Sequence, residues 1–113
     1  MTPSTTTFPK ADLVLVQFPH TSGSKATVRP ALVILDSGDA DVLLARVTSQ
    51  LHNTPFDVRV SDWQGAGLLG PSVVRLHKLA TLEKRHIQRR LGNLQTADRA
   101  AVAAVLQQVF GNW

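Results

Sequence analysis

Cysteine is absent from the 113-residue sequence, and aromatic residues make up only 5% of it. Without cysteine the chain has no disulfide bond, no thiolate nucleophile and no cysteine-ligated zinc site, which suits a reducing cytoplasm. The sequence also lacks an apolar run of the ~18 residues that a membrane-spanning helix needs, and residues 1–10 contain no signal-peptide core. We therefore expect a cytoplasmic protein that has no membrane partner.

The length of the chain fits one domain, because a single hydrophobic core usually occupies about 100 to 150 residues. Residues 1–10 are rich in Thr, Ser and Pro and are predicted to form a flexible N-terminal arm. Residues 11–113 are predicted to form the single domain. With 43% hydrophobic and 18% charged residues, the chain has enough apolar surface for a core and enough charge to stay soluble.

The formal net charge of +4 is concentrated in one part of the chain. Residues 75–90 contain six Lys or Arg and one acid, Glu83, whereas five of the eight acids fall within residues 36–62. A basic cluster of this kind attracts phosphate backbones. A solvated basic surface without a ligand explains the charge equally well.

Short apolar runs, separated by Pro and Gly, recur along most of the chain. Each has the length of a β-strand and is dominated by Val, Ile and Leu. The runs fall at residues 12–18, 31–35, 42–47, 56–60, 72–79 and 87–94. Six short strands predict a mainly-β fold, either a small barrel or a sandwich.

The last segment of the chain has the periodicity of a helix. Thr96 is predicted as its N-cap, Asp98 favours its first turn, and the helix should end near Gly111. Four apolar residues fall on one stripe of this helix: Val102, Val105, Leu106 and Val109. We expect this stripe to pack on the β structure and to carry no function of its own.

Arg29 stands between a small polar segment, residues 19–28, and an apolar strand. The strand can hold a residue in this position still while substrate enters past the loop. A guanidinium can grip a phosphate with two parallel hydrogen bonds and can stabilise the extra negative charge of a pentacoordinate transition state. A surface ion pair at the start of a strand is the alternative reading.

The third predicted strand ends in a group of polar residues. Strand alternation puts Arg46, Thr48 and Gln50 on one side and Ser49 on the other. Hydroxyls and amides at a strand end can donate hydrogen bonds to phosphate oxygens. The tripeptide Thr-Ser-Gln is also common turn material, so this feature alone is weak.

Arg75 and His77 are two residues apart and therefore point to the same side of the fifth predicted strand. Histidine exchanges a proton near neutral pH and arginine holds phosphate, which together is what ribonuclease-type transesterification requires. A solvent-facing strand edge is the alternative. The acids are scattered and the histidines lie on different segments, so no metal site and no cofactor are expected.

These features occur together in an order that resembles the MazF/PemK/Kid toxins over about residues 11–110. The resemblance rests on the segments ADLVLVQFPHT, RPALVIL, VTSQ, GLLGPSVVRLHKLATL and RRLGNL, which follow one another at similar spacing. It departs at Ala11, where the family usually has glycine. No single segment is decisive, but the combination is specific.

The resemblance implies a small SH3-like barrel of the CcdB/MazF/PemK type that forms a homodimer. It also implies the toxin of a type II toxin–antitoxin system, an mRNA interferase silenced by a MazE-like antitoxin whose acidic tail covers the groove. The expected reaction is metal-independent cleavage of single-stranded RNA. In it the 2′-hydroxyl of the substrate attacks the adjacent phosphate, giving a 2′,3′-cyclic phosphate or 3′-phosphate and a 5′-hydroxyl end.

Carried over by position, the resemblance assigns catalysis to Arg29 and Thr48, with Ser49 and Gln50 lining the same site. Arg75 falls where the Kid/PemK branch has a catalytic arginine.

Two histidines depart from the pattern of that branch. His77 stands where the branch has an aspartate, so its role as the proton carrier is our own hypothesis. His20 lies near the position of a first-loop histidine but is shifted in spacing. We expect His20 and Lys78 to contribute to substrate binding.

Two other functions stay open. A gyrase poison of the CcdB type would share the barrel but act through its C-terminal residues, and the ending Phe-Gly-Asn-Trp permits this. A noncatalytic RNA-binding barrel would use the same basic groove without cutting. Trp63 is the best aromatic candidate to touch a base, unless it covers the barrel end or a subunit interface.

Overall fold

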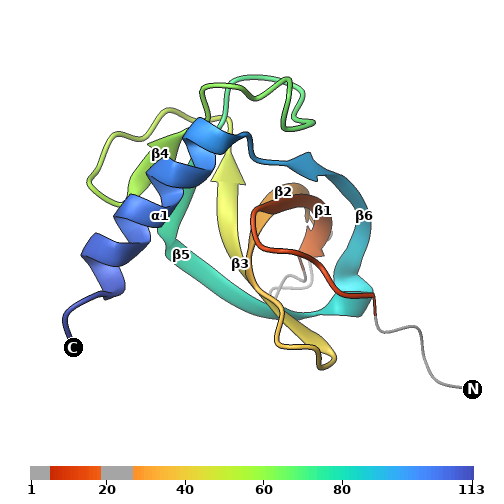
Figure 1. The fold of residues 1–113 in the computed structure, drawn as a ribbon. Helices are drawn as coiled ribbons and strands as arrows, with labels where there is room; N and C mark the ends of the chain where they lie inside the picture. The colour runs from red at the N-terminus through yellow and green to blue at the C-terminus, as the bar shows by residue number, and fades with distance from the viewer. Residues whose placement is uncertain (1–5, 19–26) are drawn as a thin grey trace, which may run out of the picture.

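The computed structural model describes residues 6–18 and 27–113, and Figure 1 shows the strands followed by a C-terminal helix. No helix in this part of the chain is long and apolar enough to cross a membrane. The 3-10 turn η1 (Lys84–His86) separates the last two strands. The other elements are β1 (Asp12–Phe18), β2 (Thr27–Leu35), β3 (Asp41–Thr48), β4 (Asp57–Arg59), β5 (Val73–Glu83), β6 (Ile87–Asn93) and α1 (Thr96–Phe110).

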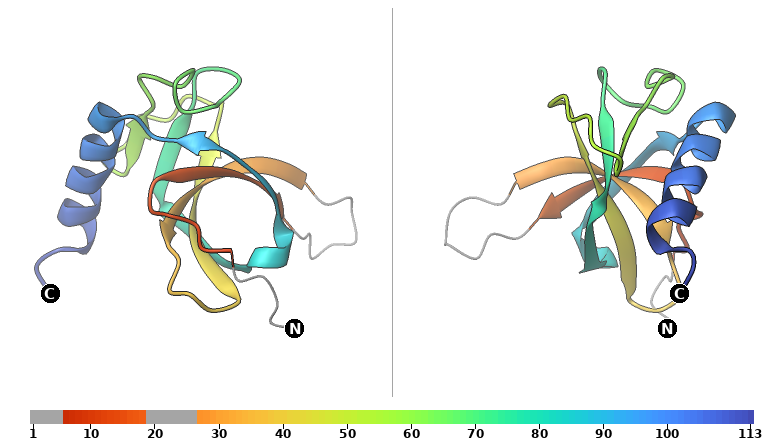
Figure 2. Two further views of the ribbon diagram at one scale, coloured as in Figure 1. Left: turned by 45° about the vertical axis from the view of Figure 1, so that its right-hand side comes forward. Right: turned by 90° about the vertical axis from the view of Figure 1, so that its left-hand side faces the viewer.

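The strands form one antiparallel sheet in the order β4-β5-β3-β2-β1-β6. β5 pairs with β3, whereas β6, which follows it after η1, pairs with β1 on the other side of the sheet. Because only η1 joins β5 to β6, the sheet must curl until these two strands meet (Figures 1 and 2). The result is a small barrel with a C-terminal helix, which confirms the predicted mainly-β fold.

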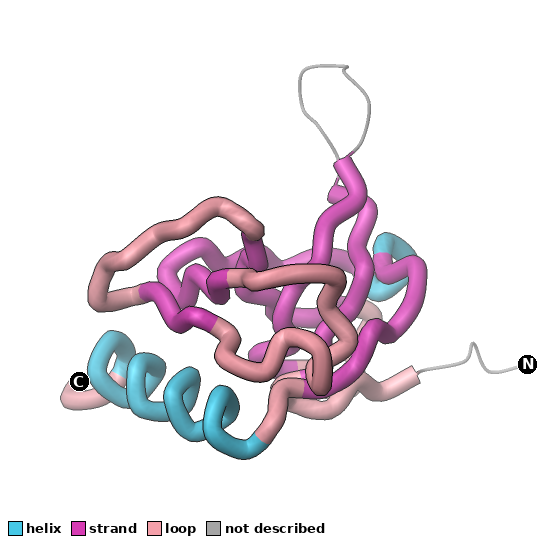
Figure 3. Tube along the Cα trace, turned by 90° about the horizontal axis from the view of Figure 1, so that it is seen from above, coloured by secondary structure: helices cyan, strands magenta, loops and turns pink. Residues whose placement is uncertain are grey.

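Strand alternation divides the apolar residues between two cores. One core, on the inner face of the curled sheet, contains Val14, Val16, Ala31, Val33, Val42 and Leu44. The other lies between the opposite face and α1 and contains Val102 of the helix, with Val105 and Leu106 packed against it. Figure 3 shows α1 along one side of the molecule, outside the curled strands. The predicted packing of the helix stripe is confirmed for these three residues.

Several element boundaries differ from the prediction. β5 continues to Glu83, beyond the predicted residues 72–79. β2 begins at Thr27, four residues before the apolar run, because β1 also pairs with the residues that precede this run: Gln17 is opposite Val28, and Val16 is opposite Arg29. The prediction of Thr96 as the helix N-cap is wrong. Gln95 occupies that position and makes no side-chain capping hydrogen bond, so Thr96 is the first helical residue.

The end of the predicted N-terminal arm lies against the barrel. Phe8 packs on the inner core, and its backbone N–H donates to Asp36 Oδ2 at 2.8 Å. Asp36 also accepts from the backbone of Gly38 and forms an ion pair with Lys84 Nζ at 2.9 Å. Burial by itself raises the pKa of Asp36, but these hydrogen bonds and the charge of Lys84 outweigh burial and lower it.

Candidate functional site

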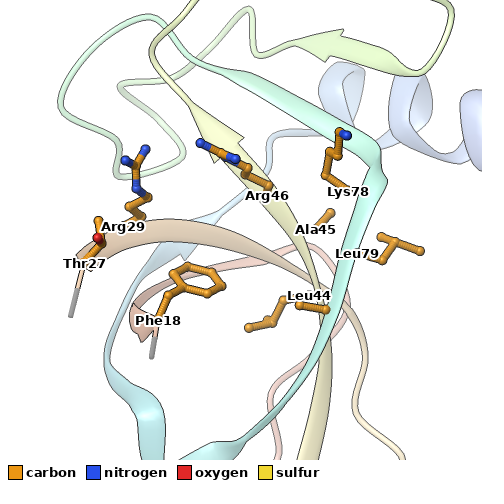
Figure 4. Close-up of a pocket in the computed structure, with 9 residues that line it drawn as sticks. Phe18, Thr27, Arg29, Leu44, Ala45, Arg46, Lys78 and Leu79 are labelled. Atoms are coloured by element: carbon orange, nitrogen blue, oxygen red, sulfur yellow. The ribbon is translucent and has the colours of Figure 1, made fainter. Parts of the chain in front are cut away.

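A pocket of about 400 Å³ opens where β1 ends and β2 begins (Figure 4). Its lining has an apolar part formed by Phe18, Leu44, Leu79 and Ala80. Three cations from three different strands also line it: Arg29 of β2, Arg46 of β3 and Lys78 of β5. No acid belongs to this lining. The pocket is therefore positively charged on one side and apolar on the other.

The register of β2 against β3 explains how the arginines come together. Ala31 pairs with Arg46 at the end of this ladder, and Arg29 and Thr48 each lie two residues beyond that pair. Opposed residues of neighbouring strands share a face, as do residues two apart on one strand. Arg29, Arg46 and Thr48 therefore lie on the face that carries the inner core, at its polar end.

Thr48 is held at the end of β3, where only 6% of the residue is exposed. Its Oγ1 accepts a hydrogen bond from the backbone N–H of Gln50 at 3.1 Å. This contact uses the oxygen as an acceptor, so the hydroxyl hydrogen is available for donation to a ligand. Ser49 and Gln50 follow the strand and are exposed.

A large bulge in β5 brings Lys78 to the pocket. Ala45 of β3 pairs with Leu79, but the next residue of β3, Arg46, pairs with Arg75. Residues 76–78 therefore have no partner on β3. Such an insertion bends a strand and redirects its side chains. The bend in β5 is visible in Figure 1.

His77 lies on this bulge, next to Lys78, and is exposed. Its ring packs against Phe56, with the ring centroids 4.9 Å apart and the planes inclined by 41°. His77 is not part of the pocket lining, whereas Lys78 is. The adjacent buried residue, Leu76, anchors the bulge in the core.

Arg75 differs from the pocket cations because it is tied to an acid. Its Nε donates to Asp57 Oδ1 at 2.9 Å, and the two side chains are 15% and 2% exposed. Asp57 Oδ2 also accepts from the backbone N–H and the hydroxyl of Thr54, at 3.0 and 2.6 Å. Burial by itself raises the pKa of Asp57, but the hydrogen bonds from Arg75 and Thr54 and the charge of Arg75 outweigh it. They lower that pKa to about 2.

The ion pairs of the described residues leave the pocket cations unpaired. These ion pairs are Arg75–Asp57, Lys84–Asp36, Arg85–Glu83 and Arg90–Asp12. Within residues 6–18 and 27–113, no acid forms an ion pair with Arg29, Arg46 or Lys78. The alternative interpretation of Arg29, a surface ion pair at the start of a strand, therefore has no support among the described residues.

The structure brings some of the predicted site residues together and separates others. Arg29 and Lys78 line one pocket, and Thr48 lies on the same face beside it. His20 falls outside the described residues. The remaining predicted residues lie outside the pocket lining: Ser49, Gln50, Arg75 and His77.

Arg46 was not among the predicted site residues. Strand alternation could have identified Arg46, because it lies two residues from Thr48 on β3 and therefore shares a face with it. Trp63 is partly buried and packs against the core beneath α1, which favours the structural reading of that residue. Where side chains are described, no group of three His, Asp or Glu is close enough together to hold a metal ion.

Comparison with known proteins identifies the family. The family of PemK-like, MazF-like toxins of type II toxin–antitoxin systems matches residues 10–110. No protein of curated function matches the sequence.

Three solved structures share the fold. The Mycobacterium tuberculosis toxin MazF-mt6 is 23% identical, with a TM-score of 0.72 over 90% of this chain and 99% of that chain. A chain of the MazE-MazF complex from Deinococcus radiodurans is 22% identical, with a TM-score of 0.76 over 96% and 100% of the two chains. An endoribonuclease from Mycobacterial species is 16% identical, with a TM-score of 0.76 over 98% and 99%. Since the family matches nearly the whole chain, this protein belongs to the PemK/MazF toxin family.

Proposed function

We propose that this protein is the toxin of a type II toxin–antitoxin pair and that it cleaves single-stranded RNA internally. The observation that supports this most is the pocket in which Arg29, Arg46 and Lys78 gather without an acidic partner among the described residues. Such a pocket suits a ligand that carries phosphates and a flat apolar group. A structural relative from Mycobacterial species is an endoribonuclease, which agrees with this ligand class.

The reaction we propose needs no group beyond the substrate and the protein. The 2′-oxygen of a ribose attacks the adjacent phosphorus, the new O2′–P bond forms, and the P–O5′ bond breaks. The 2′-hydroxyl proton passes to a base, and the departing O5′ takes up a proton. The products are a 2′,3′-cyclic phosphate, which water can open to a 3′-phosphate, and a 5′-hydroxyl end.

Arg29 and Thr48 are the residues we assign to the reacting phosphate. The guanidinium of Arg29 carries a delocalised positive charge, which can stabilise the extra negative charge of the phosphorane. The Thr48 hydroxyl, with its oxygen already accepting from Gln50, can donate to a nonbridging phosphate oxygen. Because arginine side chains do not normally release a proton in proteins, we assign Arg29 to charge stabilisation in preference to proton donation.

His77 is the candidate for proton transfer. It is exposed on the bulge beside Lys78, and its ring is oriented by Phe56. Arg75, the other catalytic candidate on β5, is held in place by its ion pair with Asp57, which offsets much of its charge. His20 is the alternative proton carrier or a substrate contact, and Ser49 and Gln50 are further substrate contacts beside Thr48.

We also propose a homodimer and a MazE-like antitoxin as the partners of this chain. The D. radiodurans relative was solved together with MazE. An acidic antitoxin segment would neutralise the unpaired cations of the pocket and compete directly with RNA. Two copies related by a two-fold axis would join two basic surfaces into a longer groove.

The test is incubation of the purified protein with a long, unstructured RNA in EDTA, beside the Arg29→Ala and Thr48→Ala variants. The new ends are then sequenced. We expect discrete cuts with 5′-hydroxyl ends that both variants lose. Arg85→Ala is the matched control, because Arg85 is an exposed arginine on η1 that pairs with Glu83. RNA left intact across many sequences would contradict the proposal.

A further inference from the structure

The pocket beside Arg29 has two chemically different parts (Figure 4). Phe18, Leu44 and Leu79 present apolar side-chain surface, and Phe18 contributes an aromatic ring. A concave apolar surface beside an aromatic ring is the kind of surface on which nucleobases stack, whatever their sequence. The volume of about 400 Å³ lies within the about 300–1,000 Å³ typical of small-ligand sites. One nucleotide unit matches this space.

The positive part of the pocket holds more charge than one phosphodiester can balance. Arg29, Arg46 and Lys78 are exposed, and none of them pairs with an acid in the described part of the chain. Like charges that line one pocket repel one another, and binding anions between them relieves the repulsion. Each phosphodiester carries a single negative charge, so three cations match consecutive phosphates of one strand.

Arg46 and Arg75 are neighbours in the β3–β5 ladder, yet their surroundings differ. Asp57 accepts from Arg75 Nε and neutralises much of its charge, and only 15% of the Arg75 side chain is exposed. Arg46 is exposed and lines the pocket with Arg29. Of this pair, the cation that faces a ligand in the pocket is therefore Arg46.

We infer that this pocket is a nucleotide subsite next to the scissile phosphate, an inference that rests on the proposed function. Arg46 and Lys78 hold the phosphate of the neighbouring nucleotide. The apolar part, formed by Phe18, Leu44 and Leu79, receives its base. Arg29 lines this subsite and shares a face of the sheet with Thr48, and we assign the reacting phosphate to these two residues.

The experiment measures binding and needs no cleavage. The probe is a fluorescent mixed-sequence single-stranded RNA with 2′-O-methyl at every sugar, which removes the attacking hydroxyl. Arg46→Ala and Lys78→Ala should each weaken binding at least tenfold, and each should flatten the plot of log K against log salt by about 0.7. Arg85→Ala, which removes one positive charge outside the pocket, should bind as the wild type does.

A second probe tests the apolar part. An oligomer with the same backbone but no bases should bind the wild-type protein more weakly than the complete RNA. Phe18→Ala and Leu79→Ala should reduce this difference. Leu79 is 36% exposed, so its variant keeps the test valid if Phe18→Ala, which also removes a core contact, fails to fold.

The outcomes separate the subsite from the catalytic proposal. If Arg46→Ala and Lys78→Ala bind the probe as Arg85→Ala does, the subsite is wrong, whether or not the protein cuts RNA. If both variants bind weakly but the wild-type protein cuts no RNA, the pocket is a nucleotide-binding site of a noncatalytic protein, and the endoribonuclease proposal falls. If both variants bind weakly and the wild-type protein cuts RNA, both proposals stand.

Discussion

Arg75 and Asp57 form an ion pair across β5 and β4, with Arg75 Nε 2.9 Å from Asp57 Oδ1. The Asp57 side chain is 2% exposed and also accepts two hydrogen bonds from Thr54. β4 has only three residues, and this ion pair adds to the backbone pairing that holds β4 against β5. Arg75 therefore has a structural task in addition to any part in catalysis.

Asp57→Asn should lower the free energy of unfolding at pH 7 by about 2 kcal/mol, from a folded-state pKa of about 2 against 3.8 for the free group. Because the folded pKa is depressed, this contribution is present above pH 3.8 and is lost as the pH falls toward 2. The difference between wild type and variant should therefore shrink between about pH 4 and pH 2. Urea unfolding at several pH values measures it, and a difference independent of pH would contradict the prediction.

Ala11→Gly should stabilise the protein by about 0.5 to 1 kcal/mol. Ala11 has φ of 71°, in the left-handed region that is unfavourable for residues with a Cβ. This geometry explains why the family usually has glycine here. Thermal unfolding measures the change. The control is Ala104→Gly, on the exposed face of α1, which should lower the free energy of unfolding by about 1 kcal/mol. Equal losses in both variants would show that Ala11 is not strained.

Gly92→Ala should destabilise the barrel by about 1 to 3 kcal/mol. A Cβ at Gly92 would collide with the backbone carbonyl of Ala66, and one at Gly67 would collide with that of Leu91. The backbones of β6 and the loop before β5 can approach this closely only without side chains. Gly70→Ala is the control, since nothing lies within 4 Å of the added Cβ. Chemical unfolding of the two variants should differ clearly, and similar stabilities would count against the close approach.

A single 2′-deoxy sugar at the scissile position should abolish cleavage of an otherwise unchanged RNA, while binding changes little. The reason is that the attacking oxygen is missing but the phosphates and bases remain. Gel analysis of the cleavage products and anisotropy measure the two effects. Continued cutting at the substituted site would mean that water or another nucleophile attacks the phosphorus.

Removal of residues 111–113 should leave RNA cleavage within about twofold of wild type. Trp113 is fully exposed, and Gly111 makes only the backbone bond that ends α1. A gyrase poison of the CcdB type would depend on this end of the chain. A truncated protein that still cuts RNA but has lost toxicity in cells would favour that second function.

The local patterns predicted the elements correctly because they depend on neighbours along the chain. Apolar runs with Pro and Gly between them located the six strands, and the helical stripe of Val102, Val105 and Leu106 located α1 and the face it buries. The position of Arg29 at the start of a strand could also be read locally. The contacts that a residue makes with neighbouring strands could not be predicted from the local sequence.

Asp98 shows the limit of such reasoning. The sequence suggested a residue that favours the first turn of α1. In the structure it is 3% exposed and accepts hydrogen bonds from Ser61 and from the backbone of Asp62, so it fixes the loop after β4 to the helix. Burial by itself raises the pKa of Asp98, but these hydrogen bonds outweigh it and lower the pKa.

The sequence alone determined the alternation of strands and turns, the terminal helix and the basic character of the molecule, since periodicity and composition are properties of the chain itself. The tertiary structure decided which cations are free. The β3–β5 register and the bulge at residues 76–78 place Arg75 where it forms an ion pair with Asp57. The same arrangement places Arg46 and Lys78 in the pocket with Arg29. That division depends on pairing between strands far apart in the chain, which no single strand encodes.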